Sequence, residues 1–121
     1  MEAKIYKMGF AEEGMFKYIV VEFEDELAFG VINPMELHKT ALELILLRKG
    51  IRKYDRQMNA EEDTQIAAKE TKGLYEMISA GILQEEGDYW LAGGMSHDYK
   101  VPTDPEVIEK LPELLGKRVI T

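Results

Sequence analysis

The residues best suited to binding chemistry are five basic side chains within nine positions: Arg48, Lys49, Arg52, Lys53 and Arg56. Three of them, Arg48, Arg52 and Arg56, repeat at a spacing of four, which would align them on one face of a helix. Like charges at this spacing repel by roughly 0.2–0.5 kcal/mol per pair in an isolated helix, so the ladder needs anions beside it. Carboxylates of this chain, a partner subunit and a phosphate-bearing ligand are the three possible sources.

The rest of the chain is acidic, with 23 acidic against 15 basic residues and a net charge of −8. A general nucleic-acid binder spreads positive charge over a whole face. We therefore interpret residues 48–56, called the cationic stretch below, as a local site for a phosphate group. The alternative is a solvated helix face that pairs with nearby glutamates.

A second group of candidates surrounds the glycine pair at 93–94, where Tyr89, Trp90, His97 and Tyr99 bring aromatic rings close to open backbone. Stacking of a base on an aromatic ring is worth about 1–3 kcal/mol, and arginine forks match phosphate oxygens. An aromatic loop facing the cationic stretch would make a nucleotide pocket. The alternative is that Tyr89 and Trp90 are hairpin residues that cover a helix.

The candidate ligand-binding residues are Arg48, Arg52, Arg56, Asn59, Tyr89, Trp90, Tyr99, Lys117 and Arg118. Among them, Lys117 and Arg118 are the second choice for the phosphate contact if the cationic stretch is only a solvated surface.

Catalytic groups are not recognisable at motif spacing. The chain has no cysteine, which removes thiolate nucleophiles, disulfides and cysteine-based zinc sites. His38 and His97 lie far apart in the sequence, and their neighbours do not have the spacing of converging metal ligands. Ser79 and Ser96 have no base at motif spacing. We therefore expect a binding protein rather than an enzyme, with no metal and no cofactor.

The elements that position these residues are predicted as one α+β domain over 1–121, a length suited to a single core. Residues 3–33 are rich in aromatic and β-branched residues separated by turn residues, which predicts a three-stranded antiparallel meander. The central run, 16–23, is apolar on both of its alternating faces. We expect helices on one face and a second subunit on the other, which means a homo-oligomer.

Two long helices are predicted within residues 34–81. The first would start at Asn33, a favoured N-cap, with Pro34 and Glu36 at suitable positions after it. Gly50 is either tolerated in this helix or ends it, and the arginine stripe is continuous only in the first case. The second helix would start at Asn59 and stop at Gly81.

Residues 82–121 are predicted as a short hairpin, a loop and a C-terminal helix. The hairpin would turn at 86–88, where Gly87 and acidic residues supply turn chemistry. The loop would cover 92–103. The last helix would begin near 103–106, be interrupted at Pro112 and end before Lys117.

The order of these elements resembles the phage Thoeris anti-defence proteins of the first described type. The resemblance rests on the strand segment 14–23, the capped Asn-Pro-Met-Glu-Leu-His at 33–38 and the Asn-Ala-Glu-Glu-Asp helix start at 59–63, and covers most of 3–85. It implies a homo-oligomer with an N-terminal sheet and helices, and with pockets shared between subunits. Such proteins hold cyclic ADP-ribose isomers made by TIR-domain enzymes without cleaving them, and some also hold cyclic oligonucleotides at a separate site.

We therefore predict that this protein sequesters a cyclic nucleotide immune signal in the cytoplasm of an infected bacterial host. In this interpretation an aromatic ring stacks on the adenine, and arginines bind the pyrophosphate. No membrane partner is expected, because no apolar run approaches the roughly 20 residues of a membrane span.

Two alternatives come from other functional classes. The first is an acidic protein that inhibits a protein partner by direct contact, which the net charge favours. The second is a winged-helix DNA binder, suggested by a helix and hairpin over 74–91. Its wing tip would place Glu85, Glu86 and Asp88 against DNA phosphates, so we expect no DNA partner.

Overall fold

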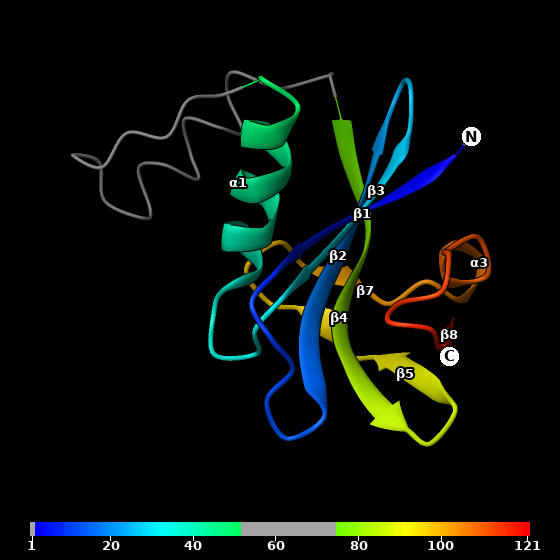
Figure 1. Cartoon of the computed structure of the whole chain (residues 1–121). Coiled ribbons are helices and arrows are strands. Elements are labelled where there is room, and N and C mark those ends of the chain that lie inside the picture. Colours follow the sequence, from blue (N-terminus) through cyan, green and yellow to red (C-terminus); the bar gives the residue numbers. More distant parts are fainter. Residues whose placement is uncertain (1, 52–74) are drawn as a thin grey trace.

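The computed structural model describes residues 2–51 and 75–121, and these residues are mostly in β-strands (Figure 1). Strands account for 49% and helices for 15%, so the prediction of an α+β fold with two long helices and a C-terminal helix is wrong. The strands are β1 (Ala3–Met8), β2 (Met15–Phe23), β3 (Leu27–Ile32), β4 (Tyr75–Glu86), β5 (Tyr89–Gly93), β6 (Met95–Ser96), β7 (Val101–Pro102) and β8 (Arg118–Ile120), and the helices are α1 (His38–Arg48) and α3 (Pro105–Ile108).

Six of the described strands form one curled sheet in the order β1-β3-β2-β4-β5-β8. The interior pairs are antiparallel, whereas β1 runs parallel to β3 at one edge and β8 runs parallel to β5 at the other. The predicted meander is wrong in its pairing, because β3 lies between β1 and β2. The alternation of apolar residues predicts a strand but not its partner. The short strands β6 and β7 pair with each other.

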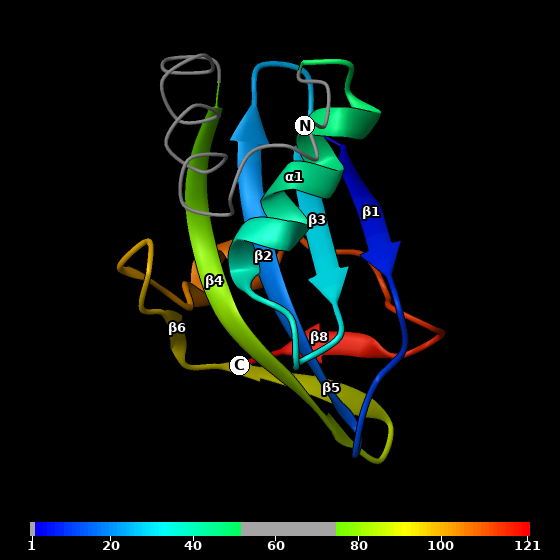
Figure 2. The ribbon, with the colours of Figure 1, turned by 90° about the vertical axis from the view of Figure 1, so that its left-hand side faces the viewer.

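Both faces of the sheet are covered by the chain itself. Ile19 and Val21 of β2 pack on the side of α1, and Phe16 and Val20 pack on the side of α3 and β8. Figure 2 shows α1 lying across β1, β3 and β2, while α3 and β8 are on the far side. The apolar face for which we expected a second subunit is therefore buried by residues 105–119 of the same chain.

The first helix begins later than predicted. Asn33 caps a turn instead: its Oδ1 atom accepts the Met35 N–H at 2.9 Å, and its carbonyl oxygen accepts the Glu36 N–H at 3.0 Å. The N-cap of α1 is Leu37, whose side chain makes no capping hydrogen bond. The same residue types favour an Asx turn and a helix N-cap, so the motif does not distinguish them.

The end of α1 decides between the two possibilities for Gly50. Gly50 has a φ of 72°, in the left-handed region that glycine adopts without a steric cost. Its N–H donates to Leu47 O at 3.1 Å, and the Ile51 N–H donates to Leu46 O at 3.0 Å. These two bonds are a Schellman motif, which ends a helix. Helix α1 therefore stops before Arg52.

The second predicted helix, from Asn59 to Gly81, is only partly covered by the structure. Residues 52–74 lie outside the described residues, and residues 75–81 belong to β4 instead of a helix. Gly81 is not a helix stop. A Cβ atom at Gly81 would lie 2.1 Å from Gly93 O and 2.7 Å from Thr103 Oγ1, so only glycine permits this close crossing of backbones.

The hairpin prediction is confirmed, because β4 and β5 pair antiparallel with Glu86 opposite Tyr89 around Gly87. The start of the last helix is also as predicted, since Asp104 accepts the Glu106 N–H at 3.0 Å as its N-cap. The helix is much shorter than predicted, with four residues, and the chain returns to the sheet as β8. Within 2–51 and 75–121 no helix is long and apolar enough to cross a membrane.

A one-directional series of hydrogen bonds attaches residues 103–104 to the sheet. The Asp104 N–H donates to Ser79 Oγ at 2.9 Å, and Thr103 Oγ1 donates to Ala80 O at 3.1 Å. The Tyr18 hydroxyl donates to Thr103 Oγ1 at 2.8 Å, so it accepts from Ser79 Oγ at 2.9 Å. Each of the three hydroxyls both donates and accepts, which offsets the cost of burying Tyr18 and Ser79. Burial raises the pKa of Tyr18, so the phenol stays protonated.

The close crossing at Gly81 gives a test of the fold. Gly81→Ala should lower the free energy of unfolding by about 3 kcal/mol or prevent folding, because the added methyl group meets backbone that has no room to move. Gly93→Ala is the matched control, since a Cβ atom there meets nothing within 4 Å. Urea unfolding followed by circular dichroism measures both. Equal stability of the two variants would contradict the crossing.

Candidate functional site

The end of helix α1 divides the cationic stretch, because Arg48 belongs to the helix and the residues after it do not. Arg48 is exposed in the last turn of α1, where a cation interacts favourably with the helix dipole. Because α1 stops there, it cannot carry the continuous stripe of Arg48, Arg52 and Arg56 that the spacing suggested. Arg52, Arg56 and Asn59 lie outside the described residues.

Lys49, the second residue of the cationic stretch, is committed to contacts within the chain. Its Nζ atom lies 3.1 Å from Asp25 Oδ1, 3.1 Å from Glu26 Oε1 and 4.4 Å from the centre of the Phe23 ring. The bond from Lys49 lowers the pKa of the Asp25 carboxyl group. Glu26 also accepts a hydrogen bond from the Tyr6 hydroxyl, and burial together with that bond raises the pKa of Tyr6. For Lys49, the required anions are this chain's own carboxylates.

The aromatic candidates lie in different layers. Trp90 is 1% exposed, donates its Nε1–H to Leu114 O at 3.0 Å and packs against Phe16 with ring centres 5.3 Å apart. It is a core residue of the β4–β5 hairpin, as the alternative predicted, but its described neighbours are Phe16 and Leu114 instead of a helix. Tyr99 packs against the core on the α1 side of the sheet, and Tyr89 is half-buried on β5. The sheet therefore separates Tyr99 from Trp90, and the two rings do not form one pocket.

The C-terminal cations are also separate from α1. Lys117 Nζ lies 3.1 Å from Glu85 Oε2 and 6.0 Å from the centre of the Trp90 ring. Arg118 is exposed on β8, and Figure 1 shows β8 and α1 on opposite sides of β2 and β4. The described candidates therefore do not converge on a single nucleotide pocket.

The two histidines have different environments. His38 is buried at the start of α1, and its Nε2 atom lies 2.9 Å from Gly81 O. Because a carbonyl oxygen only accepts, Nε2 carries the proton and donates it. Burial lowers the pKa of His38. His97 is exposed. In the part of the chain that the structure describes, no group of three His, Cys, Asp or Glu side chains could hold a metal ion.

Four exposed apolar side chains lie on two neighbouring segments, the end of β1 with the loop after it and the loop before α1. They are Met8, Phe10, Met35 and Leu37, called the apolar end patch below. Phe10 is 80% exposed and Met35 is 79% exposed, more than the other large hydrophobic residues that the structure describes. The sequence reasoning missed this patch because it assigned the residues around 35 to a helix and treated those around 10 as a plain connection.

The two loops of the apolar end patch are attached to each other. Asn33 Nδ2 donates to Glu12 Oε1 at 2.8 Å, and a Cβ atom on Gly9 would lie 3.3 Å from Asn33 Cβ. Lys7 Nζ donates to Gly9 O at 2.8 Å and lies 5.3 Å from the centre of the Phe10 ring. These contacts fix the patch on a folded platform.

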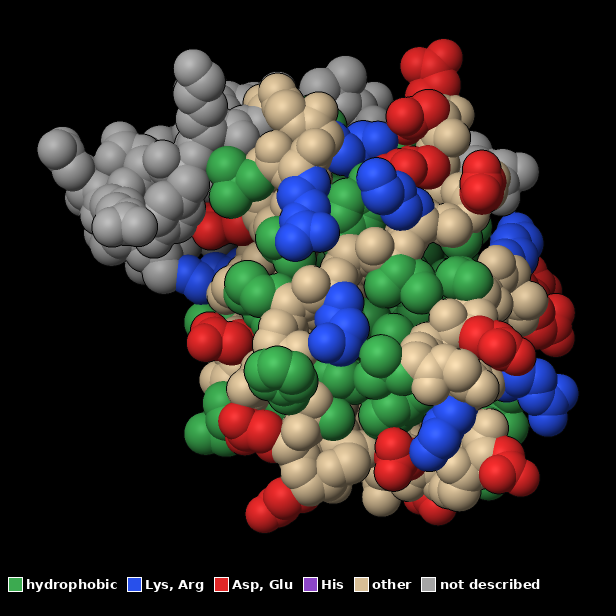
Figure 3. Space-filling view, viewed as in Figure 1, with side chains coloured by type: hydrophobic (Ala, Val, Ile, Leu, Met, Phe, Trp, Pro, Cys, Tyr) green, Lys and Arg blue, Asp and Glu red, His purple; other side chains and the backbone are tan. Residues whose placement is uncertain are grey.

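Acidic side chains adjoin this end of the molecule. The Glu85 N–H donates to Gly14 O at 2.7 Å, which brings the β4–β5 turn beside the β1–β2 loop. Figures 1 and 2 both show the two turns together at the lower end. The turns carry Glu12, Glu13, Glu85, Glu86 and Asp88, all acidic. Figure 3 shows acidic side chains mainly around the periphery of one face, with hydrophobic and basic side chains nearer its centre.

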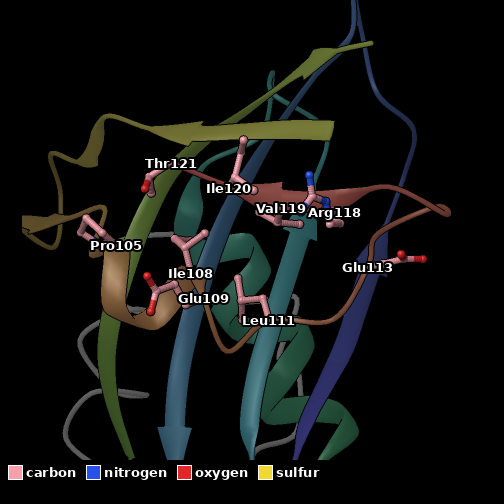
Figure 4. Close-up of a pocket in the computed structure, with 9 residues that line it drawn as sticks. All are labelled: Pro105, Ile108, Glu109, Leu111, Glu113, Arg118, Val119, Ile120 and Thr121. Atoms are coloured by element: carbon pink, nitrogen blue, oxygen red, sulfur yellow. The ribbon is translucent and has the colours of Figure 1, made fainter. Parts of the chain in front are cut away.

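A groove of about 390 Å³ lies between α3 and β8 (Figure 4). One side is formed by Pro105, Ile108, Glu109 and Leu111, and the other side by residues 118–121. Sequence reasoning found Arg118 as a cation but missed the groove, since it placed 117–121 after the last helix instead of in a strand.

Comparison with known proteins gives no match. No protein-family model fits the chain, and neither a curated protein nor a solved structure is significantly similar to it.

The buried imidazole of His38 predicts a pH dependence of stability. Its folded-state pKa is below the unfolded value of about 6.5, so the unfolded chain binds the proton more readily. Stability should be full above about pH 6.5 and fall as the pH drops below it. Urea unfolding at pH 7.5 and pH 5 measures this loss. His38→Gln should remove most of it, and His97→Gln should retain it; an equal loss in the His38 variant would contradict the assignment.

Proposed function

We propose that this protein is an acidic interaction protein that binds a basic surface of another protein through the apolar end patch. The observation that carries the proposal is the exposure of Phe10 and Met35 on two loops that the hydrogen bond from Asn33 to Glu12 joins. Exposed apolar patches on a folded protein mark interaction sites more often than scattered single residues do.

The energetics favour apolar contact as the source of affinity. Burying a Phe or Met side chain contributes about 1.5–3 kcal/mol relative to leaving it in water. Both loops already have a fixed conformation, through the turn at Asn33 and the bond to Glu12, so little ordering is needed on binding. The patch therefore offers preorganised apolar area.

Charge determines which partner suits the patch. The net charge of −8 and the acidic turns beside the patch attract a basic surface and repel an acidic one. Charge complementarity mainly accelerates association and excludes wrong partners, whereas Phe10 and Met35 supply the contact area. The partner is accordingly a basic protein surface with exposed apolar side chains.

Binding to a synthetic peptide of lysine and leucine, with leucines on one helical face, tests this function. Phe10→Ser and Met35→Ser should each weaken binding about tenfold in fluorescence anisotropy, because apolar burial is lost. Leu115→Ser is the matched control, since Leu115 is 62% exposed but lies outside the patch. Equal affinity of the Phe10 and Leu115 variants would refute the patch as the docking surface. A lysine peptide without leucine measures the part of the affinity that comes from charge alone.

Sequestration of a cyclic ADP-ribose isomer is the second candidate, supported by the exposed position of Arg48 at the start of the cationic stretch. An arginine at this place is available to a pyrophosphate, whereas Lys49 beside it is bound by Asp25 and Glu26. In this function the protein holds the nucleotide, releases it unchanged and needs no catalytic group. A partner subunit would supply the rest of the pocket, as the resemblance implies.

Calorimetric titration with a cyclic ADP-ribose isomer tests the second candidate. Arg48→Glu should abolish binding, because a charge-assisted bond becomes a repulsion. Lys110→Glu is the control with the same charge change at another exposed position. Wild-type affinity in the Arg48 variant would exclude this contact, and consumption of excess nucleotide by a catalytic amount of protein would exclude sequestration.

A further inference from the structure

We propose that the free edge of β8 and the groove beside it bind an extended peptide segment of a partner protein by strand addition. This site is separate from the apolar end patch, and the proposal does not depend on the function proposed above. In strand addition, backbone hydrogen bonds provide affinity and pockets for alternate side chains provide specificity.

The strand order leaves one edge of β8 open. β8 is the last strand of the sheet and pairs with β5 on one side, and within 2–51 and 75–121 no strand pairs with its other side. An edge strand presents a row of backbone N–H and C=O groups that can pair with another chain.

The groove runs along this open edge. Residues 118–121 line it without a gap, although alternate side chains of a strand point to opposite faces. Four consecutive lining residues therefore indicate that the groove follows the strand backbone. Figure 4 shows β5 on one side of β8, and Ile108 and Leu111 on the other side.

The groove has the surface that a strand with apolar side chains requires. Pro105 and Leu111 give it accessible apolar lining, whereas Ile108 is 1% exposed and belongs to the core behind the groove. In an added strand, alternate side chains would enter this lining while the others would face solvent. The volume of about 390 Å³ is at the lower end of the range of ligand sites.

The charged residues around the groove determine which charges the two ends of the bound peptide should carry. Glu109 and Glu113 are exposed residues of the groove, whereas the Arg118 guanidinium points away from Ile108 and Leu111 in Figure 4. The accessible charges beside the apolar lining are thus acidic, in a protein whose net charge is −8. The complementary occupant is an extended segment with alternating apolar residues flanked by lysine or arginine.

The opposite edge of the sheet lacks these features. Edge strand β1 carries Lys4 and Lys7, and lysines on an edge strand are a common protection against strand pairing. The hollow beside β1 is lined mainly by charged residues, including Glu2, Lys4 and Asp25. Beside β8, five of the nine lining residues are apolar, against three of seven beside β1, so strand addition is favoured at β8.

The test uses the full chain, labelled with nitrogen-15, and the synthetic peptide acetyl-Lys-Thr-Val-Thr-Ile-Thr-Val-Lys-amide. Amide shifts should change at residues 118–121 and saturate, and the same peptide with alternate N-methylated amides should bind at least about tenfold more weakly, because it cannot donate strand hydrogen bonds. Glu109→Lys together with Glu113→Lys should weaken binding about fivefold or more. Glu24→Lys together with Glu76→Lys, which makes the same charge change at other exposed positions, should not.

Four outcomes would overturn the proposal. They are equal binding of the N-methylated peptide, shifts confined to the apolar end patch, no saturable shift at about millimolar peptide, and self-association of the free protein through residues 118–121. The second outcome would move peptide binding to the patch and so support the function proposed above. The serine variants of Phe10 and Met35 keep the two surfaces distinguishable, because they should leave shifts at β8 unchanged.

Discussion

The hydrogen bonds that run from the Asp104 N–H through Ser79, Tyr18 and Thr103 to the Ala80 carbonyl oxygen fix where the C-terminal segment meets the sheet. From that point the chain forms α3, crosses the apolar face and returns as β8. A single unsatisfied hydroxyl in this series would cost about 1–3 kcal/mol. Both the covering of the second face and the groove beside β8 therefore depend on this series.

The same region of β4 also anchors helix α1 on the other face of the sheet. The carbonyl oxygen of Gly81 accepts the hydrogen bond from His38 of α1, while Thr103 bonds to the adjacent residue, Ala80. Helix α1 and the C-terminal segment thus both attach to β4 within residues 79–81. Gly81 tolerates no side chain at this place, because the Gly93 carbonyl group of β5 and the Thr103 hydroxyl crowd it.

Local chemistry made part of this fold predictable. The alternating run 16–23, the turn at Gly87 and the N-cap at Asp104 each carry a short-range signal, and each forms the element expected. The remaining features depend on contacts between distant residues. Parallel pairing of β1 with β3 and of β8 with β5 leaves no mark in the sequence, and a single polar residue such as Asn33 suits a turn as well as a helix start.

The candidate site shows the same division. Basic and aromatic residues could be selected as candidates from their types, yet their positions depended on the fold. Trp90 is in the core, Lys49 is bound by Asp25 and Glu26, and Arg118 faces away from Ile108 and Leu111. The exposure of Phe10 and Met35 could not be recognised from sequence, because single apolar residues in a connection or at a predicted helix start carry no signal of exposure.

The covering of Phe16 and Trp90 by residues 107–119 has a consequence for biosynthesis. These aromatic residues precede the segment that buries them. Their side chains are therefore exposed to solvent until the ribosome has synthesised residues 107–119. Contacts between residues so far apart in sequence also form slowly. During that interval the nascent chain exposes a large apolar face. Chaperones that recognise aromatic and β-branched segments can bind this face until residues 107–119 pack on it.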